Sequence, residues 1–492
     1  MSAKLNIYAR RAVYCIGVFV AAFMIAVFSI RYREPTASDA FADGDLIMRL
    51  FVAPTSFSFI FFLCLTFFTT QTAKAEHVNV PSTNTKHQKQ FVAQVVGLQW
   101  LNPLQRMDYP TEWQLLWTMG LVKPNQNDDM VKSDPRAFSS VQAVAIIAFG
   151  NNGLTPFSEY HRQFLEKIIG KHRDIYFSDS EYFYNAHSLK DKTTWRELAG
   201  IHVEYAIPHG KIDPVEATKL VRDCIIDSFD IGLHSFPNAW TRSTPPDVSI
   251  TLGGPNAGFT SLSAGLDYLQ AHPKETVWVM NWDAPSYPLK DEQINENMVL
   301  LVLAGPDYNT ERAPLAWLGY PTVTRVADFE AKSGQAPRAI QAWKAVLDKA
   351  AHNAGKHTID IGFTIHDAGK LHPDSSDRLA LIGRTLTESV PELDFVKQTF
   401  NTPALLGEMG AGTALTNVAL GIAYANHLGK TVLVAGTTDA SQPTATLVLP
   451  PAVVSPIQAD KPWFRARGGN TAYLPWWGLR HDAKPGSQGY SR

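Results

Sequence analysis

Apolar runs of strand length alternate with amphipathic helical patterns along most of the chain after residue 90. In the helical segments, such as Ser158 to Lys171, apolar residues recur every three to four positions. Strands that alternate with helices are typical of sheets whose faces are covered by helices. The pattern therefore predicts an α/β fold, with strands at Phe91 to Leu101, Val141 to Phe149, Gly200 to Ile207, Met298 to Ala304, Ala316 to Thr324, Thr358 to Ile365 and Thr444 to Leu449.

Two helices begin with capping signals. Asp213 is predicted to cap a helix that starts at Pro214, because an aspartate side chain accepts hydrogen bonds from the free N–H groups of the first turn. Val215 and Cys224 are expected on the apolar face of that helix. Thr111 is likewise predicted to cap a short amphipathic helix.

Two stretches of the chain look like copies of each other. Leu252 to Met280 reads LGGPNAGFTSLSAGLDYLQAHPKETVWVM, and Gly407 to Ala435 reads GEMGAGTALTNVALGIAYANHLGKTVLVA. Each copy contains a glycine-rich turn, a helix of small residues and a buried strand, and matching residues such as His272 and His427 keep a constant offset. Such a repeat predicts two similar α/β halves packed face to face.

The chain is longer than one hydrophobic core usually supports, so several regions are expected within its 492 residues. Each predicted half contains one copied unit. The predicted regions are membrane-anchoring segments at 1–77, a polar linker at 78–90, an N-terminal extension at 91–140, a first half at 141–330, a second half at 331–452 and an irregular tail at 453–492.

Two apolar runs precede the linker. Residues 12–30 contain no charge and are long enough to cross the roughly 30 Å hydrocarbon core of a bilayer, and residues 50–68 form a second, aromatic-rich run. Lys4, Arg10 and Arg11 before the first run favour a cytoplasmic N-terminus, and lysines after the second run favour the same side. These features predict an N-terminal transmembrane hairpin that anchors the protein in the inner membrane with its body in the cytoplasm.

A second interpretation of the N-terminus stays open. Met48, Arg49, the second apolar run and the small-residue sequence around Ala75 have the order of a signal peptide that ends near Ala75. Cleavage there would export the body to the periplasm. Arginines in the loop between the two runs favour this alternative, because positively charged loops tend to stay in the cytoplasm.

Charge and cysteine content exclude some kinds of partner and site. The formal net charge of -2 provides no basic field of the kind that attracts nucleic acid. Two of the three cysteines, Cys15 and Cys64, lie in the apolar runs. We therefore expect neither a disulfide framework nor a cysteine-based metal site.

On the copied units and the order of its elements, the region from Val141 to Pro450 resembles the thiolase-like, condensing-enzyme superfamily of β-ketoacyl synthases. The resemblance implies duplicated α/β halves with helices between mixed sheets. In that family a cysteine lies in the turn before the first small-residue helix, one histidine follows a strand of the second half, and another opens the glycine-rich turn. A helix N-terminus lowers the pKa of such a cysteine, and the imidazoles assist reaction at the carbonyl.

Three of the family's four functional elements are changed in this chain. The cysteine position falls at Pro255-Asn256-Ala257, where no side chain is a nucleophile of that kind. His366 in IHDAG corresponds to the first histidine, whereas Glu408 in GEMGAG replaces the second, and a carboxylate would repel a developing oxyanion. The family's Gly-Phe-Gly-Gly loop aligns near residues 436–439, which read GTTD. The resemblance thus implies a retained fold without the family's chemistry.

Other candidate sites have simpler structural interpretations. The glycines between residues 407 and 412 suggest a phosphate loop, but their order differs from the dinucleotide fingerprint, so a close-packed turn is expected. His366, Asp367 and His372 lack the spacing of a metal site and are expected to be surface polar residues. Cys224 lies in the middle of a helix and is expected to behave as a buried hydrophobe. We expect no catalytic residue, no cofactor and no metal.

Tryptophans gather in the regions outside the copied units. Because tryptophan anchors many protein interfaces, they suggest a docking surface. The alternative is that these regions bury their tryptophans against the core. The residues concerned are Trp100, Trp113, Trp117, Trp476 and Trp477.

The segment from Leu98 to Met130, LQWLNPLQRMDYPTEWQLLWTMGLVKPNQNDDM, together with the thiolase-like body, is similar to the family of type VI secretion lipase-effector adaptors. Members of that bacterial family hold a phospholipase toxin and load it onto the spike protein of the contractile secretion machine. The resemblance implies a non-catalytic adaptor or chaperone whose partners are a lipase effector protein, the type VI spike protein and, through the N-terminal segments, the membrane.

Two other functions remain open. A divergent thiolase-like enzyme for acyl transfer or condensation would use His366 and Glu408. A periplasmic or membrane-associated lipid-binding protein is suggested only by the N-terminal apolar runs.

Overall fold

The structure is a computed structural model of the chain that describes residues 90–143, 157–178, 201–231, 244–285, 294–369, 373–457, 463, 465 and 475–478. The apolar runs at 12–30 and 50–68 lie outside these residues, as do nearly all of the linker and most of the strand predicted at Val141 to Phe149. Across the described ranges, no helix is both long enough and apolar enough to cross a membrane.

Five strands form the first half of one mixed sheet. In spatial order they are β3 (Asp247–Gly253), β2 (His202–Pro208), β4 (Thr276–Asp283), β5 (Asn297–Ala304) and β1 (Val92–Leu101). The strands β3, β2 and β4 are parallel, whereas β5 runs antiparallel to β4 and β1 runs antiparallel to β5.

Five more strands form the second half: β9 (Thr399–Asn401), β8 (Ile361–His366), β10 (Thr431–Gly436), β11 (Thr444–Leu449) and β6 (Ala316–Gly319). The first three are parallel, β11 is antiparallel to β10, and β6 is antiparallel to β11. The order and directions of the first half are thus repeated, and antiparallel pairing of β1 with β6 joins the halves. The duplicated halves expected from the copied units are confirmed.

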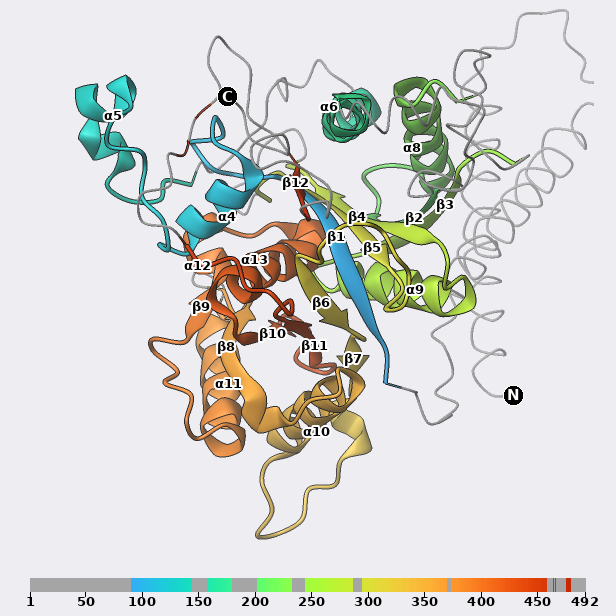
Figure 1. Ribbon diagram of the computed structural model, residues 1–492. Helices are drawn as coiled ribbons and strands as arrows, with labels where there is room; N and C mark the ends of the chain where they lie inside the picture. Colours follow the sequence, from blue (N-terminus) through green and yellow to red (C-terminus); the bar gives the residue numbers. More distant parts are fainter. Residues whose placement is uncertain are drawn as a thin grey trace, which may run out of the picture. The chain divides into compact units, whose positions relative to one another are not determined.

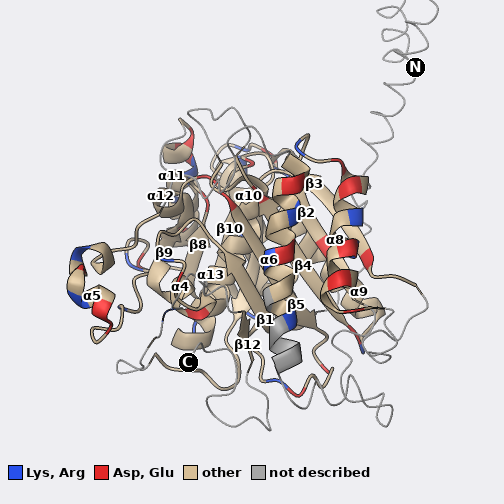
Figure 2. Ribbon diagram, turned by 90° about the horizontal axis from the view of Figure 1, so that it is seen from above, with Lys and Arg blue, Asp and Glu red and all other residues tan. Residues whose placement is uncertain are grey.

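Helices lie between the halves and on both outer faces, which gives five layers (Figure 1). The helices of the copied units, α9 (Ala257–Ala271) and α13 (Thr413–Leu428), form the middle layer and contact each other. The outer face of the first half is covered by α6 (Phe157–Ser178) and α8 (Pro214–Ser228), and that of the second by α10 (Arg338–Asn353) and α11 (Ser375–Ser389). Figure 2 shows charged residues along α6 and α8, whereas α13 carries none.

Short elements complete the described fold. The two-residue strand β7 (Thr322–Val323) pairs with β11, and β12 (Trp476–Trp477) pairs with β1. The short helices are α4 (Thr111–Thr118), α5 (Asp129–Ser133), η2 (Pro135–Phe138), η3 (Val326–Asp328), η4 (Thr358–Asp360), α12 (Thr402–Leu406) and η5 (Gly410–Gly412).

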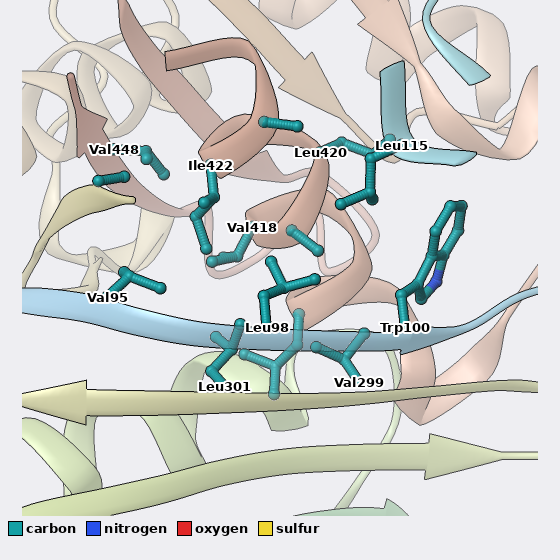
Figure 3. Close-up of a cluster of buried hydrophobic side chains, with 14 of the residues drawn as sticks. Val95, Leu98, Trp100, Leu115, Val299, Leu301, Val418, Leu420, Ile422 and Val448 are labelled. Carbon is teal, nitrogen blue, oxygen red and sulfur yellow. The ribbon is translucent and has the colours of Figure 1, made fainter. Parts of the chain in front are cut away.

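The core follows the two-residue period of the strands. In β4, Val277 and Val279 face the middle layer, while Trp278 and Met280 face the outer helices. Figure 3 shows the middle-layer cluster, in which side chains of β1 and β5 meet those of α13. Because β1 belongs to the N-terminal extension, that extension supplies a central strand of the sheet.

The tryptophans outside the copied units are buried. None of the five is more than 8% exposed, and in α4 the rings of Trp113 and Trp117 stack with centroids 4.8 Å apart. The alternative of burial is confirmed for all five, and they form no exposed tryptophan surface. Every residue of α4 is buried, so this helix is not amphipathic, and its N-cap is Pro110 rather than Thr111.

The cap of α8 is as predicted, and so is the burial of Cys224 on its apolar face, but Val215 does not belong to that face. Asp213 Oδ1 accepts from the N–H groups of Val215 and Glu216. Val215 is 77% exposed, whereas Ala217 is buried. Residues two positions apart on a helix differ in direction by about 200°, so Val215 and Ala217 point to opposite sides of α8.

Candidate functional site

The candidate site is the junction where the two copied turns meet. The starts of α9 and α13 are packed so closely that a Cβ on Gly258 would lie 3.0 Å from the Cβ of Ala414. Parallel pairing places His366 opposite Ala435 and Asn401, so that the carboxyl ends of β8, β9 and β10 reach the same edge. Loops at the carboxyl ends of parallel strands are the usual location of sites in α/β proteins.

His366 ends β8 and is 1% exposed. Its Nδ1 accepts from the backbone N–H of Ala368 at 3.3 Å, so the proton of a neutral ring is assigned to Nε2. Burial lowers the pKa of His366 to about 4, which keeps the ring neutral near pH 7. Among the described residues Nε2 has no hydrogen-bond partner. His366 thus offers one free donor at the junction.

Asp367 ties two loops of the second half together. Its Oδ1 accepts from the backbone N–H of Thr437 at 2.5 Å and from the Thr437 hydroxyl at 2.8 Å, and its Oδ2 accepts from the Thr438 hydroxyl at 2.8 Å. Burial raises the pKa of Asp367, and these hydrogen bonds oppose the rise. The expectation that His366 and Asp367 are surface residues is wrong, because they are only 1% and 2% exposed.

Glu408 lies against the loop that follows His366. A Cβ on Gly369, which has φ +81°, would lie 3.2 Å from Glu408 Oε1. Gly369 is fixed by Asn401, whose Nδ2 donates to its carbonyl at 2.8 Å and whose Oδ1 accepts from its N–H at 3.2 Å. The structure therefore brings Glu408 and the His366 loop together, as the resemblance to condensing enzymes implies.

The turn before α9 carries Asn256 at the N-cap, within the three residues 255–257 to which the resemblance assigns the family's cysteine. The Asn256 side chain contacts Gly436 at the end of β10, so the turn does face the junction. Cys224 is elsewhere, buried in α8 on the outer face of the first half. Burial raises the pKa of the Cys224 thiol to about 12, so it behaves as a small hydrophobe and not as a thiolate.

The glycine-rich turn before α13 is filled by the protein itself. Asp283, at the end of β4, accepts from the N–H of Ala411 at 3.0 Å and pairs with Lys211 Nζ at 2.5 Å. A Cβ on Gly410 would collide with the Asp283 carboxylate. The close-packed turn is confirmed, and the carboxylate already satisfies the helix N-terminus where a phosphate would bind.

Of the three possible metal ligands near the end of β8, the structure describes His366 and Asp367. His372 lies outside the described residues. Both oxygens of Asp367 accept hydrogen bonds from threonines. In the described part of the chain, no group of three or more His, Cys, Asp or Glu side chains is arranged to hold a metal ion.

Sequence reasoning missed Asp283 and Lys211. Asp283 could have been found, because it is an acidic residue at the end of an almost continuous apolar strand, a place where polar side chains usually have a role. Lys211 carries no such signal. The junction as a whole offers a neutral imidazole donor and a half-buried carboxylate, and the residues directly before α9 are Pro255 and Asn256.

The described residues form a duplicated α/β protein with two buried helices between mixed half-sheets, the arrangement that the resemblance to the thiolase-like superfamily implies. Within it, residues 315–450 match the model of the family described as type VI lipase adapter protein Tla3, C-terminal. The resemblance to lipase adaptors is thereby confirmed, although the matched residues lie in the second half and not in the segment from Leu98 to Met130. The comparison with curated proteins found no match.

Several solved structures are similar to this chain. An oxazolomycin ketosynthase domain from Streptomyces albus JA3453 has 12% identity and a TM-score of 0.42, and the match covers 76% of this chain and 100% of that one. The ishigamide ketosynthase/chain length factor has 14% identity and a TM-score of 0.47 over 74% and 100%. A variant of OleA from Xanthomonas campestris has 8% identity and a TM-score of 0.40 over 73% and 98%.

Proposed function

We propose that this protein is a non-catalytic adaptor that binds a phospholipase effector and loads it onto the spike protein of a type VI secretion system. The observation that carries the proposal is the match of residues 315–450 to the type VI lipase adapter family. In this role the chain supplies a folded binding surface and turns over no substrate.

The junction supports a structural role for its polar residues. The resemblance places the family's cysteine within Pro255-Asn256-Ala257, and Asp367 and Asp283 both accept hydrogen bonds that hold loops in place. Folds of this kind host more than one function, so the function has to be argued from the site. Here the described polar contacts of Asp367 and Asp283 support the fold, which is consistent with an adaptor.

Deletion of the gene tests the proposal. Export of the phospholipase should stop while other effectors of the same system are still secreted, and a plasmid copy should restore export. Loss of all secretion would indicate a role in the machine itself. Unchanged export of the phospholipase would contradict the proposal.

A divergent acyl-transfer enzyme is the second candidate. The specific observation in its favour is His366 Nε2, a buried donor without a partner among the described residues. Such a donor at a junction could stabilise an oxyanion. Purified protein that hydrolyses or condenses acyl thioesters, and loses this activity in His366→Ala, would establish this candidate and defeat the adaptor.

We further propose that residues 12–30 and 50–68 anchor the adaptor in the inner membrane with its body in the cytoplasm. The cytoplasm is where an effector is loaded before secretion. A reporter fused after Ala75 distinguishes this arrangement from export, since alkaline phosphatase is active only in the periplasm. Phosphatase activity would favour the signal-peptide interpretation that ends near Ala75.

A further inference from the structure

A surface groove lies in the N-terminal extension, away from the junction. Its cavity volume is about 330 Å³, and it is formed by the end of α4, the loop after it, α5, η2 and the residues up to Val141. The apolar lining consists mainly of Trp117, Val122, Pro124, Val131, Pro135 and Phe138. Exposed residues at the rim, among them Lys123 and Ser140, open the groove to solvent.

Ring stacking and an ion pair fix the two walls of the groove in place. Trp117 stacks on Trp113, which stacks on Tyr109 with ring centroids 3.8 Å apart, and these rings belong to the main core. On the opposite wall, α5 is fixed by Asp128, which caps the helix and binds Arg465 at 2.8 Å. A rigid apolar groove loses little conformational entropy when it receives a side chain.

The charged side chain in the described lining of the groove is a lysine. Lys123 is the charged residue among the twelve described lining residues, and the Arg106 guanidinium lies 5.0 Å from the centre of the Phe138 ring. Of the carboxylates near the groove, Asp128 pairs with Arg465, whereas Asp129 and Asp134 are exposed and lie outside the lining. The groove therefore complements an apolar side chain that is followed by a carboxylate.

Its size fits a polypeptide segment. Small-molecule pockets commonly span about 300–1,000 Å³, so this groove is at the lower end and fits one or two large side chains. Aromatic and aliphatic anchors in such pockets dominate the affinity of many protein complexes. Proline and tryptophan walls also suit an extended chain, because they offer flat apolar surfaces of fixed shape.

We propose that this groove is where the adaptor holds its lipase, by receiving an apolar side chain of the lipase with an adjacent carboxylate paired to Lys123. The proposal rests on the proposed function, and it adds the location and the chemistry of the contact. The lining residues of the groove include none of the residues of the junction.

Affinity measurements on the full-length protein test the charge pairing. Lys123→Glu reverses the charge in the lining, whereas Lys132→Glu makes the same change on the exposed side of α5, outside the lining. Both residues are exposed, so neither change disturbs the core. With the purified phospholipase effector as the probe, we expect Lys123→Glu to weaken binding about tenfold or more and Lys132→Glu to change it less than about threefold.

Photo-crosslinking tests the location. A benzophenone amino acid replaces Ser140 at the groove or, as the matched control, Ser133 on α5. We expect crosslinks to the phospholipase from position 140 and none from position 133. Phospholipase that binds both charge variants equally and does not crosslink from position 140 would overturn the groove while leaving the adaptor function intact.

Two further outcomes are informative. A crosslink from position 140 to the spike protein in place of the phospholipase would overturn the assignment of the occupant. Failure of the unaltered protein to bind the phospholipase at all would contradict the proposed function itself, together with the groove that depends on it.

Discussion

Glu296 provides a test of the packing between α6 and the first half-sheet. It directly precedes β5, is fully buried, and accepts hydrogen bonds from the Tyr160 hydroxyl at 2.6 Å and from Trp282 Nε1 at 3.4 Å. Burial raises the pKa of Glu296 from 4.5 to about 8, against the opposing effect of the two hydrogen bonds. The carboxyl is therefore protonated in the folded protein at neutral pH.

The sign of the pH dependence follows from this shift. Between pH 4.5 and pH 8 the folded protein holds a proton that the unfolded chain has released, so the free energy of unfolding falls as the pH rises through this window. Each pH unit in the window is worth about 1.4 kcal/mol, and the loss levels off above the folded-state pKa. From pH 6 to pH 9 this residue should lower the free energy of unfolding by about 2 to 3 kcal/mol.

Glu296→Gln should remove that loss. The amide oxygen can accept from Trp282 Nε1 while the amide NH₂ donates to the Tyr160 oxygen, because a phenol can turn its hydroxyl to accept. Urea unfolding of both proteins at pH 6 and pH 9 gives the difference, and Glu216→Gln, at an exposed site on α8, controls for the chemical change. An identical pH dependence in wild type and Glu296→Gln would refute the buried, protonated carboxyl.

Three further predictions concern packing and the tail. Gly97→Ala should lower the free energy of unfolding by about 1–3 kcal/mol in a urea titration, because the new Cβ would lie 2.5 Å from the Trp477 ring. Gly410→Ala should lower the melting temperature more than Gly120→Ala, since both glycines have positive φ but only Gly410 also meets the Asp283 carboxylate. Burial of Asp128 raises its pKa, but the hydrogen bond from Arg465 outweighs this and the pKa is lowered. The Asp128–Arg465 pair therefore stabilises the folded protein above the unfolded-state pKa of Asp128, and this contribution is lost as the pH falls through the folded-state pKa. Asp128→Asn should lower the free energy of unfolding by about 1 kcal/mol at pH 7. In that variant the free energy of unfolding should also change less between pH 5 and pH 2.

The duplicated fold could be predicted from the sequence because its signals are local. A strand, a glycine-rich turn and a small-residue helix each leave a pattern within a few residues, and the repetition of that pattern from Leu252 and from Gly407 revealed the two halves. The spatial order of the strands has no such local signal. It depends on β1, which enters the middle of the sheet from the far N-terminal side of the described chain.

The candidate site was only partly predictable, because its polar residues are defined by distant partners. Asp367 reads as a surface residue until Thr437 and Thr438 are placed beside it, and the turn at Gly410 reads as an anion site until Asp283 fills it. The tryptophans were misleading for a related reason. A tryptophan at an interface and a tryptophan packed against a core have the same sequence signal, and only the stacking of Trp113 and Trp117 distinguishes them.

Calorimetric titration of the full-length protein with the phospholipase effector, in wild-type and His366→Ala forms, tests most directly whether this scaffold acts by binding. We expect saturable binding that the substitution leaves unchanged, because His366 lies at the junction and not in the groove of the N-terminal extension. The adaptor function would be contradicted if the wild-type protein did not bind the phospholipase and instead turned over an acyl thioester, with this activity lost in His366→Ala.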